Sequence, residues 1–275
     1  MDSVALVKHK KDIGESLEQG LELIGGFGEL RSPVLVKPNI CTISDNTGYS
    51  VTRVEVVEAL LDLVLKENGN LSIRIIESDS QSKTTGDAFE KFGYTRLASR
   101  MQRAGFDVSL VNLSESRLTS TSFEGDYFTN PELPDLIAGS GYFISVAAAK
   151  THYLTFITGV LKNLFGVLPR KDQSFYHSRI DDVIVDLARL IRPDLSIVDA
   201  RVGIEGWNGP TTRRLDALIL GYGPASVDAT MTRIMGFEPR EVRHLVESAK
   251  HDLGTLDPNV RGSSIESVAV RFEKP

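Results

Sequence analysis

Residues 33–77 read PVLVKPNICTISDNTGYSVTRVEVVEALLDLVLKENGNLSIRIIE and contain the pattern that decides the fold. Residues 33–37 form a continuous apolar run, which is typical of a strand buried on both faces of a parallel sheet. A polar loop follows over residues 38–50, and the spacing then predicts a helix over 53–68 and a second strand over 71–77. Strand, helix and strand in this order make a βαβ unit, so we expect a parallel sheet.

The same alternation continues on both sides of this unit. It predicts strands at residues 4–7, 108–113, 142–147, 195–199, 217–220 and 267–272, with an edge strand at 119–123. It predicts helices at residues 13–24, 84–92, 96–104, 156–165, 181–191, 226–235 and 241–251. We therefore expect an α/β fold: a mostly parallel, Rossmann-like sheet with helices on both faces and two lobes around a cleft. The lobes would be residues 1–140 and 141–275, and one continuous domain is the alternative.

Composition excludes several classes of protein. The 275 residues are 41% hydrophobic and 25% charged, which is a globular balance and excludes wholesale disorder. The net charge of −6 argues against nucleic acid as a partner, because electrostatic nucleic-acid binding needs a basic surface. Cys41 is the single cysteine, so the chain cannot form an intrachain disulfide, a four-cysteine zinc site or an iron–sulfur cluster of its own.

Apolar stretches in the sequence are short. None approaches the ~20 residues that a membrane-spanning helix requires. The basic residues near the N-terminus follow a short apolar run, which is not the order found in a signal peptide. We therefore expect a cytoplasmic protein without a membrane partner. A homo-oligomer is compatible with the sequence, which does not fix the oligomeric state.

Ligands of parallel α/β sheets bind outside the carboxyl ends of the strands, so we expect the binding residues in the loops at these ends. One such loop runs from Lys37 and Asn39 to Thr52 and Arg53. Thr52 is predicted to cap the following helix, with Glu55 at capping-box spacing, and the free N–H groups of a helix start attract an anion. These four residues are therefore candidates for binding an anionic cofactor or substrate. The alternative is a surface loop whose polar residues only form turns.

The segment after the predicted strand at 142–147 gathers chemically active side chains. Lys150 and His152 lead into a predicted helix that carries Lys162, Asn163 and Gly166. Histidine can move a proton or bind a metal, and a lysine can pair with an anion or act as a nucleophile when burial lowers its pKa. We expect catalytic roles for Lys150, His152 and Lys162, and cofactor contacts for Asn163 and Gly166. Taken singly, these residues would also fit a surface lysine or a helix-capping histidine.

Three further candidates lie in later loops. His177, in the segment SFYH, could bind a ligand or pack between aromatic side chains. Asp199 ends a predicted strand and opens the segment DARVGIEGWNGP, which also holds Glu205 and Trp207. We expect the two acids to act as a base or to orient a cation, and a satisfied turn is the alternative. The glycines of this loop allow it to close, so Trp207, the single tryptophan, is expected to report ligand binding.

A strand–turn–helix follows at residues 221–226. Its two glycines, Gly221 and Gly223, make up only half of a dinucleotide-binding fingerprint, and a tight turn is the simpler interpretation. Asp228, just inside the helix, could face the cleft or favour the helix N-terminus.

Several of these segments together resemble domain-of-unknown-function family 362 over most of the chain. They are VLVKPN, the Thr52–Arg53 helix start, AAAKTH, ITGVLKNLFGVLP, SFYH, SIVDARVGIEGWNGP and the helix of Asp228. The KTH…KNLFG block is the specific part. The resemblance implies a fold more firmly than a reaction, because the chemistry of the family is poorly defined. Many relatives append a ferredoxin-like module with cysteine clusters, which this chain lacks.

A more distant resemblance is to lactate racemase-type enzymes, which use a nickel-pincer nucleotide. Those enzymes carry a histidine, a lysine ten residues later that holds the cofactor, and a further histidine that ligates nickel. His152, Lys162 and His177 resemble this series, and Thr52–Arg53 resembles the phosphate-binding helix start. The resemblance implies a shared cleft, with His177 and His152 as metal ligands, rather than a shared cofactor. The sequence TGVL replaces the glycine-rich run before the lysine, Val54 replaces a proline, and this chain is much shorter.

Three functions follow as hypotheses. The first is an enzyme of the family-362 type that acts on a small anionic substrate, as a metal- or cofactor-assisted isomerase or epimerase with histidine acid–base chemistry. The second is an oxidoreductase or electron-transfer protein without its own iron–sulfur cluster. The third is a non-catalytic module that binds a nucleotide or metabolite. Bound nickel or a modified lysine, a flavin-like absorbance, or a bound nucleotide without turnover would separate them.

Overall fold

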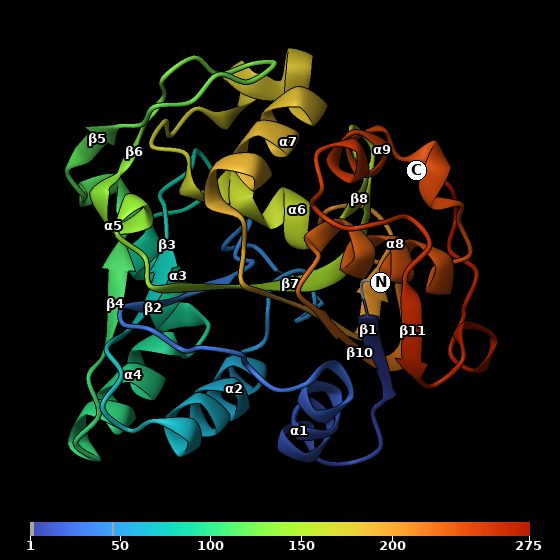
Figure 1. Ribbon diagram of the computed structural model, residues 1–275, viewed down its shortest axis with the longest axis horizontal. Coiled ribbons are helices and arrows are strands. Elements are labelled where there is room, and N and C mark those ends of the chain that lie inside the picture. Colours follow the sequence, from blue (N-terminus) through green and yellow to red (C-terminus); the bar gives the residue numbers. More distant parts are fainter. Residues whose placement is uncertain (1–2, 46) are drawn as a thin grey trace.

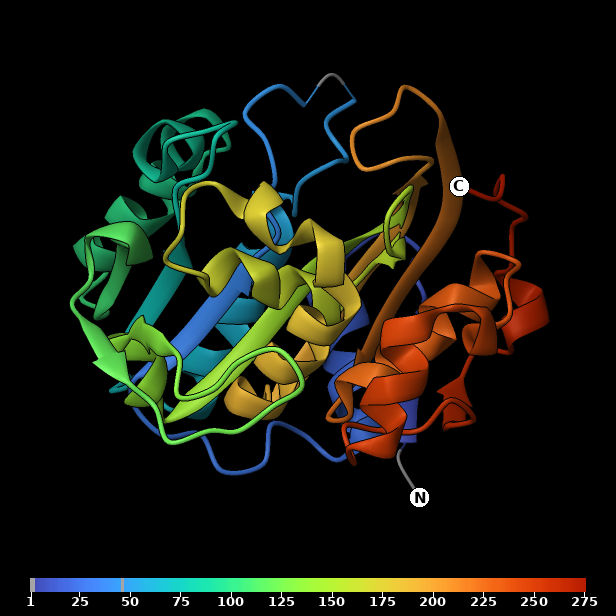
Figure 2. The ribbon, with the colours of Figure 1, turned by 90° about the horizontal axis from the view of Figure 1, so that it is seen from above.

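The computed structural model describes residues 3–45 and 47–275. In this part of the chain nine strands form one sheet in the order β11-β1-β10-β9-β7-β2-β3-β4, with β8 paired to β7 (Figures 1 and 2). The strands are β1 (Ser3–Lys8), β2 (Val34–Pro38), β3 (Ile73–Glu77), β4 (Val108–Asn112), β7 (Tyr142–His152), β8 (Phe156–Thr158), β9 (Leu195–Ile204), β10 (Thr212–Gly221) and β11 (Asn259–Gly262). A separate two-stranded sheet pairs β5 (Leu118–Ser120) with β6 (Glu132–Pro134).

Most neighbouring strands of the large sheet are parallel. β2 pairs in parallel with β3 and β7, β3 with β4, β7 with β9, and β1 with β11. The antiparallel members are β10, which pairs with β9 and β1, and β8, which returns along β7. The sheet is the expected mixed, mostly parallel sheet of a Rossmann-like α/β fold.

Helices cover both faces of the sheet, as expected (Figure 1). One face packs against α1 (Ile13–Ile24), α2 (Val54–Glu67), α3 (Thr85–Lys91) and α4 (Tyr94–Arg103). The other packs against α5 (Asp135–Ala138), α6 (Val160–Asn163), α7 (Ile180–Ile191), α8 (Pro224–Ile234) and α9 (Arg243–Lys250). Short 3₁₀ helices are η1 (Leu113–Glu115), η2 (Leu164–Val167), η3 (Gln173–Arg179), η4 (Pro239–Glu241) and η5 (Ile265–Ser267).

The boundary expected near residue 140 falls inside one continuous sheet. β2 from the first half of the chain pairs with β7 from the second half, and β1 lies between β10 and β11. Each of the two apolar cores, one on each face, therefore contains side chains from both halves, such as Val34 and Ile197 in the core beneath α1 and α2. Residues 1–140 and 141–275 therefore share one sheet and both apolar cores.

Three strands are longer than the apolar pattern predicted. β7 continues through polar residues to His152, β9 continues past Asp199 to Ile204, and β10 begins at Thr212. These polar residues belong to the strands because they pair with a neighbouring strand, as Lys150 pairs with Thr158. Asp199 therefore lies inside a strand and not at its end.

Two predicted elements are wrong. Residues 156–165 are not one helix, because they begin as β8, turn at Gly159 and continue as the short α6 and the start of η2. Residues 267–272 form no strand of the sheet. The N–H groups of Val270 and Phe272 instead bond the carbonyls of Ile234 and Met235 at the end of α8, and the side chains of Val268 and Phe272 are buried. The prediction was wrong because an extended segment that packs alternate apolar side chains onto the end of a helix has the same sequence pattern as a strand.

Strand direction decides where a ligand loop can lie. The parallel strands β2, β3, β7 and β9 all end at the same edge of the sheet. β10 runs antiparallel to β9 and pairs Gly221 with Ser196, so the turn after Gly221 lies at the opposite edge. This turn therefore does not join the loops at the carboxyl ends of the parallel strands.

Candidate functional site

A pocket of about 300 Å³ opens at the edge where the parallel strands end. Three lysines line it, namely Lys150 from β7, Lys162 from α6 and Lys171 from the segment before η3, together with the imidazoles of His152 and His177. Among the residues that the structure describes, no Asp or Glu lines this pocket. Positive charge without a carboxylate favours a bound anion, and the volume is at the lower end for organic ligands.

In the described part of the chain the ammonium of Lys162 is paired with no carboxylate and with no hydrogen-bond acceptor, whereas that of Lys150 donates to Asn39 and Ser50. It lies over the ring of Phe165, with Nζ 5.5 Å from the ring centroid. Burial lowers the pKa of Lys162 to about 8, and the nearby charge of Lys150 acts in the same direction. A lysine with such a pKa holds a fraction of neutral amine near pH 7, which is the form that accepts a proton or attacks a carbonyl.

A buried carboxylate on α8 fixes the start of the helix that carries Lys162. Both oxygens of Asp228 accept backbone hydrogen bonds, from Val160 N at 2.8 Å and from Leu161 N at 3.0 Å. A side chain at position 159 would overlap this carboxylate, so Gly159 is needed for its close approach. Asp228 thus caps a helix other than its own and does not line the pocket.

His152 ends β7 and is 7% exposed. Its Nδ1 accepts a hydrogen bond from Leu154 N at 3.1 Å, so Nε2 carries the ring proton. Burial, with the charges of Lys162 and Lys150, lowers the pKa of His152 to about 2. Burial and Lys162 also lower the pKa of His177. Both imidazoles are therefore neutral at pH 7 and can donate a hydrogen bond, but His152 is a poor acceptor of a proton.

Lys150 connects the loop after β2 to β7. Its Nζ donates to Asn39 Oδ1 and to the Ser50 carbonyl, both at 2.8 Å, and lies 3.2 Å from Cys41 Sγ. Asn39 lines the pocket together with His152, so the loops after β2 and β7 meet at one site.

A second cluster of charges lies buried beside the pocket. Lys37 Nζ and Glu77 Oε2 are 2.7 Å apart, with side chains 1% and 3% exposed, and Lys83 Nζ lies 3.8 Å from the same carboxylate. Burial lowers the pKa of Lys37, and Glu77 opposes that shift. Because Glu77 neutralises it, Lys37 is less available to a ligand than the sequence suggested.

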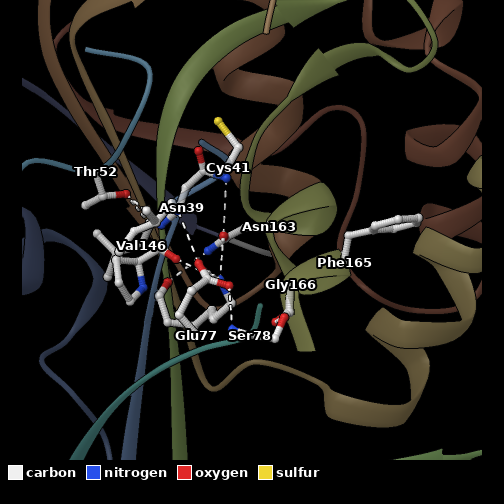
Figure 3. A network of polar contacts seen from close by, with 12 residues as sticks. Asn39, Cys41, Thr52, Glu77, Ser78, Val146, Asn163, Phe165 and Gly166 are labelled. Atoms are coloured by element: carbon white, nitrogen blue, oxygen red, sulfur yellow. Dashed lines mark hydrogen bonds and ion pairs between the residues drawn. The ribbon is translucent and has the colours of Figure 1, made fainter. Parts of the chain in front are cut away.

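Asn163 and Gly166 hold this cluster together (Figure 3). Asn163 Nδ2 donates to the Lys37 carbonyl at 2.8 Å and to Ser145 Oγ at 3.1 Å. A side chain at Gly166 would come within 2.8 Å of the Lys37 ammonium and the Glu77 carboxylate. Both residues face a narrow extension of about 70 Å³ that shares Asn39, Lys162 and others with the main pocket.

The predicted helix cap at Thr52 is wrong. The cap position of α2 is Arg53, whose side chain makes no capping bond. Thr52 Oγ1 instead donates to the Val146 carbonyl at 2.7 Å and accepts from Asn39 N at 2.9 Å. Arg53 is turned toward Asp199, with Nη2 3.3 Å from its carboxylate. These two residues hold β2, β7 and β9 together and do not line the pocket.

Asp199 and Glu205 are engaged in ion pairs. Asp199 accepts from Arg201 Nε and Nη2, both at 2.8 Å, and Arg201 holds the pKa of Asp199 below its ordinary value despite burial. Glu205 pairs with Arg213 at 2.9 Å. Neither carboxylate lines the pocket, so the structure brings together the lysines and histidines of the predicted site without its acids.

The donor set does not fit a metal ion. In residues 3–45 and 47–275 no three His, Cys, Asp or Glu side chains are grouped as a metal would require. Three lysines beside His152 and His177 also disfavour a cation. The predicted metal-ligand roles of these histidines have no support in this geometry, and we derive no step through a metal or a nickel-bearing cofactor.

Several pocket residues escaped the sequence analysis. They are Cys41, Gln81, Lys171, Gln173 and Tyr153. The loop after β3, which supplies Gln81, was a place to search because it follows a parallel strand. Lys171 lies in the loop after η2 and Gln173 is the first residue of η3, and no local pattern marks either of them.

The fold and the pocket together define a Rossmann-like α/β protein with a cationic site at the carboxyl edge of its parallel strands. The chain belongs to the family described as "Domain of unknown function (DUF362)", which matches residues 34–233. It is also similar to the thylakoid-associated protein sll1697 of Synechocystis sp., with 29% identity over 240 residues that cover 82% of this chain and 71% of that protein. Within the described residues, no helix has the length and apolar character needed to cross a membrane.

Proposed function

We propose that this protein is an enzyme that acts on a small anionic substrate in the pocket between β7, α6 and the loop after β2. The observation that carries the proposal is the lysine-lined pocket without a described carboxylate. Lys150 is already bonded to Asn39 and Ser50, whereas Lys162 has no such partner. A substrate carboxylate or phosphate would supply the missing negative charge.

In the proposed reaction Lys162 is the base and His152 is a hydrogen-bond donor. The neutral amine of Lys162 removes a proton from the carbon beside a carbonyl, and the electron pair moves to the carbonyl oxygen. The Nε2–H of His152 bonds that oxygen while it is negative, as a neutral imidazole can. The electron pair then returns from the oxygen to the carbon, and return of the proton to the other face of that same carbon completes an epimerisation. This assignment replaces the histidine acid–base chemistry expected from the sequence, because a pKa of about 2 makes His152 a poor base.

The test uses two substitutions at Lys162. Lys162→Arg keeps the positive charge but cannot act as a base, whereas Lys162→Met removes both properties. Binding of inorganic phosphate, lactate and 2-oxobutyrate is measured by calorimetry, and exchange of carbon-bound hydrogen in D₂O by NMR. We expect exchange in the wild type, binding without exchange in Lys162→Arg, and weakened binding in Lys162→Met. Lys11→Met, at an exposed lysine, is the control.

Two results would change the proposal. Exchange that persists in Lys162→Arg would exclude Lys162 as the base. Anion binding without exchange in any of the compounds would favour the non-catalytic binding module.

A cytoplasmic location and self-association are further parts of the proposal. The named relative is thylakoid-associated, so fractionation of cells at physiological salt tests the location directly. Recovery of the protein in the membrane pellet would contradict it.

A further inference from the structure

Exposed apolar side chains gather at the mouth of the pocket. In the described residues the exposed large hydrophobic side chains include Tyr153 at 65%, Phe175 at 53% and Trp207 at 39%. Tyr153 and Trp207 line the pocket themselves, and Phe175 follows the lining residue Ser174. An apolar group of this kind at the rim of a polar pocket marks a surface that a ligand or partner covers.

The ring of Tyr153 is held as a platform. It stacks on the imidazole of His152 with centroids 5.0 Å apart and an interplanar angle of 10°. The hairpin of β7 and β8 fixes this pair, because His152 pairs with Phe156 and its Nδ1 accepts from Leu154 N. One face of the tyrosine ring is therefore covered by a fixed imidazole, and much of the remaining ring is exposed at the pocket mouth.

Trp207 reaches the same pocket from the loop between β9 and β10. That loop is attached to its surroundings, since Gly206 N donates to Thr151 Oγ1 at 2.7 Å and Asn208 Nδ2 donates to the Ser44 carbonyl at 2.8 Å. Gly206 has a φ of 81°, which other residues rarely adopt. Two aromatic rings from separate elements thus lie at the mouth, above the lysines that would hold an anion.

We infer that the substrate of the proposed enzyme is an anion that carries a flat, unsaturated ring, and this inference rests on the proposed function. The anionic group lies among Lys150, Lys162 and Lys171, and the ring lies against Tyr153 and Trp207. Aromatic faces favour offset or edge contacts with another π system beyond their value as apolar surface. The volume of about 300 Å³ also exceeds what a five-atom oxyanion needs.

A matched pair of compounds tests the ring separately from the charge. Phenyl phosphate and cyclohexyl phosphate have the same charge and six ring carbons, but only the first is flat. Inorganic phosphate is the third compound, and benzoate with cyclohexanecarboxylate repeats the comparison for carboxylates. Dissociation constants are measured by calorimetry, and the fluorescence of Trp207 gives an independent signal. We expect the phenyl compound to bind at least fivefold tighter than the cyclohexyl compound and to quench Trp207.

Two variants test whether the preference for the phenyl compound depends on the ring of Tyr153. Tyr153→Leu keeps apolar bulk and should reduce the phenyl preference to less than twofold, while the affinity for inorganic phosphate stays within twofold of wild type. Tyr222→Leu, at an exposed tyrosine outside the pocket, should keep the preference.

The outcomes separate this inference from the proposed function. Equal affinity for the flat and the saturated compounds, with inorganic phosphate still bound, would refute the inference that the substrate carries a flat ring. The proposed anion site would stand. Failure of every phosphate and carboxylate to bind would overturn the proposed function itself. Sedimentation with phosphatidylglycerol vesicles, or a dimer in ultracentrifugation, that is lost in Tyr153→Leu would assign the rim to a membrane or a second copy and overturn the inference.

Discussion

Replacing Asp228 by Asn should abolish a pH dependence that is built into the core. The Asp228 side chain is fully buried, accepts two backbone N–H groups of α6, and has no cationic partner among the described residues. Burial raises the pKa of Asp228 from 3.8 to about 7, against the opposing effect of the two hydrogen bonds. The native state therefore binds this proton more tightly than the unfolded state does.

The size of the effect follows from proton linkage. When the native pKa of an acid is higher than its unfolded pKa, the protein loses stability as the pH increases from the unfolded to the native value. Between pH 5 and pH 8, ionisation of Asp228 should lower the free energy of unfolding by about 2 to 3 kcal/mol. Asn cannot ionise, but it gives up one hydrogen-bond acceptor, which costs about 1 to 3 kcal/mol at every pH.

Urea denaturation of wild type and Asp228→Asn at pH 5 and pH 8 measures this difference. We expect the variant to be less stable than wild type at pH 5 and to gain about 2 to 3 kcal/mol relative to wild type by pH 8. Taking the difference between the two proteins cancels the titration of other groups. Asp186→Asn is the matched control, because that buried carboxylate is paired with Arg189 at 3.1 Å, and its loss should destabilise the protein at pH 8. A stability difference between wild type and Asp228→Asn that is the same at both pH values would refute the reasoning.

Three further predictions concern the cluster around the pocket. Glu77→Gln should destabilise the fold by about 3 to 5 kcal/mol in denaturant melts, because it leaves the buried Lys37 without its counter-ion; a loss below about 1 kcal/mol would contradict this pairing. His152→Gln should make stability less sensitive to acid, because wild type loses stability as the pH falls below about 6.5 toward the lowered pKa of His152; an unchanged pH profile of melting temperature would count against it. Alkylation of Cys41 by iodoacetamide should block phosphate binding, because its Sγ lies in the pocket 3.2 Å from Lys150 Nζ; calorimetry that finds unchanged affinity in the alkylated protein would exclude that position for the anion.

Local sequence was sufficient for the class of fold and for the edge of the sheet where the pocket lies. The apolar run at residues 33–37, the helix after it and the strand at 71–77 predicted a parallel sheet because buried parallel strands require continuous apolar side chains. Lys150, His152, Lys162 and Asn39 were found as candidates because they follow such strands. The family model matches residues 34–233, the part of the chain that contains these candidates.

The roles of these residues depended on contacts between distant segments. Lys37 and Glu77 lie near the carboxyl ends of their strands, yet only strand order shows that β2 and β3 are neighbours and that the two charges neutralise each other. Asp199 resembled a strand-end acid until pairing with β10 extended β9 and Arg201 occupied its carboxylate. In the same way, Asp228 serves the start of α6, which is separated from it by more than sixty residues.

The sequence by itself determined the alternation of strands and helices. The spacing of apolar residues is a local property, and it differs between a strand and a helix because each buries one face. It also placed two lysines and two histidines in the segments after a predicted strand, at the edge where a parallel sheet binds its ligands. Only the tertiary structure decided which of these charges are neutralised, because an ionic partner is chosen by distance in space. It also decided the protonation of His152 and Lys162, because burial and neighbouring charges shift their pKa values. Burial and the distance to a neighbouring charge both depend on segments that are far apart in the sequence.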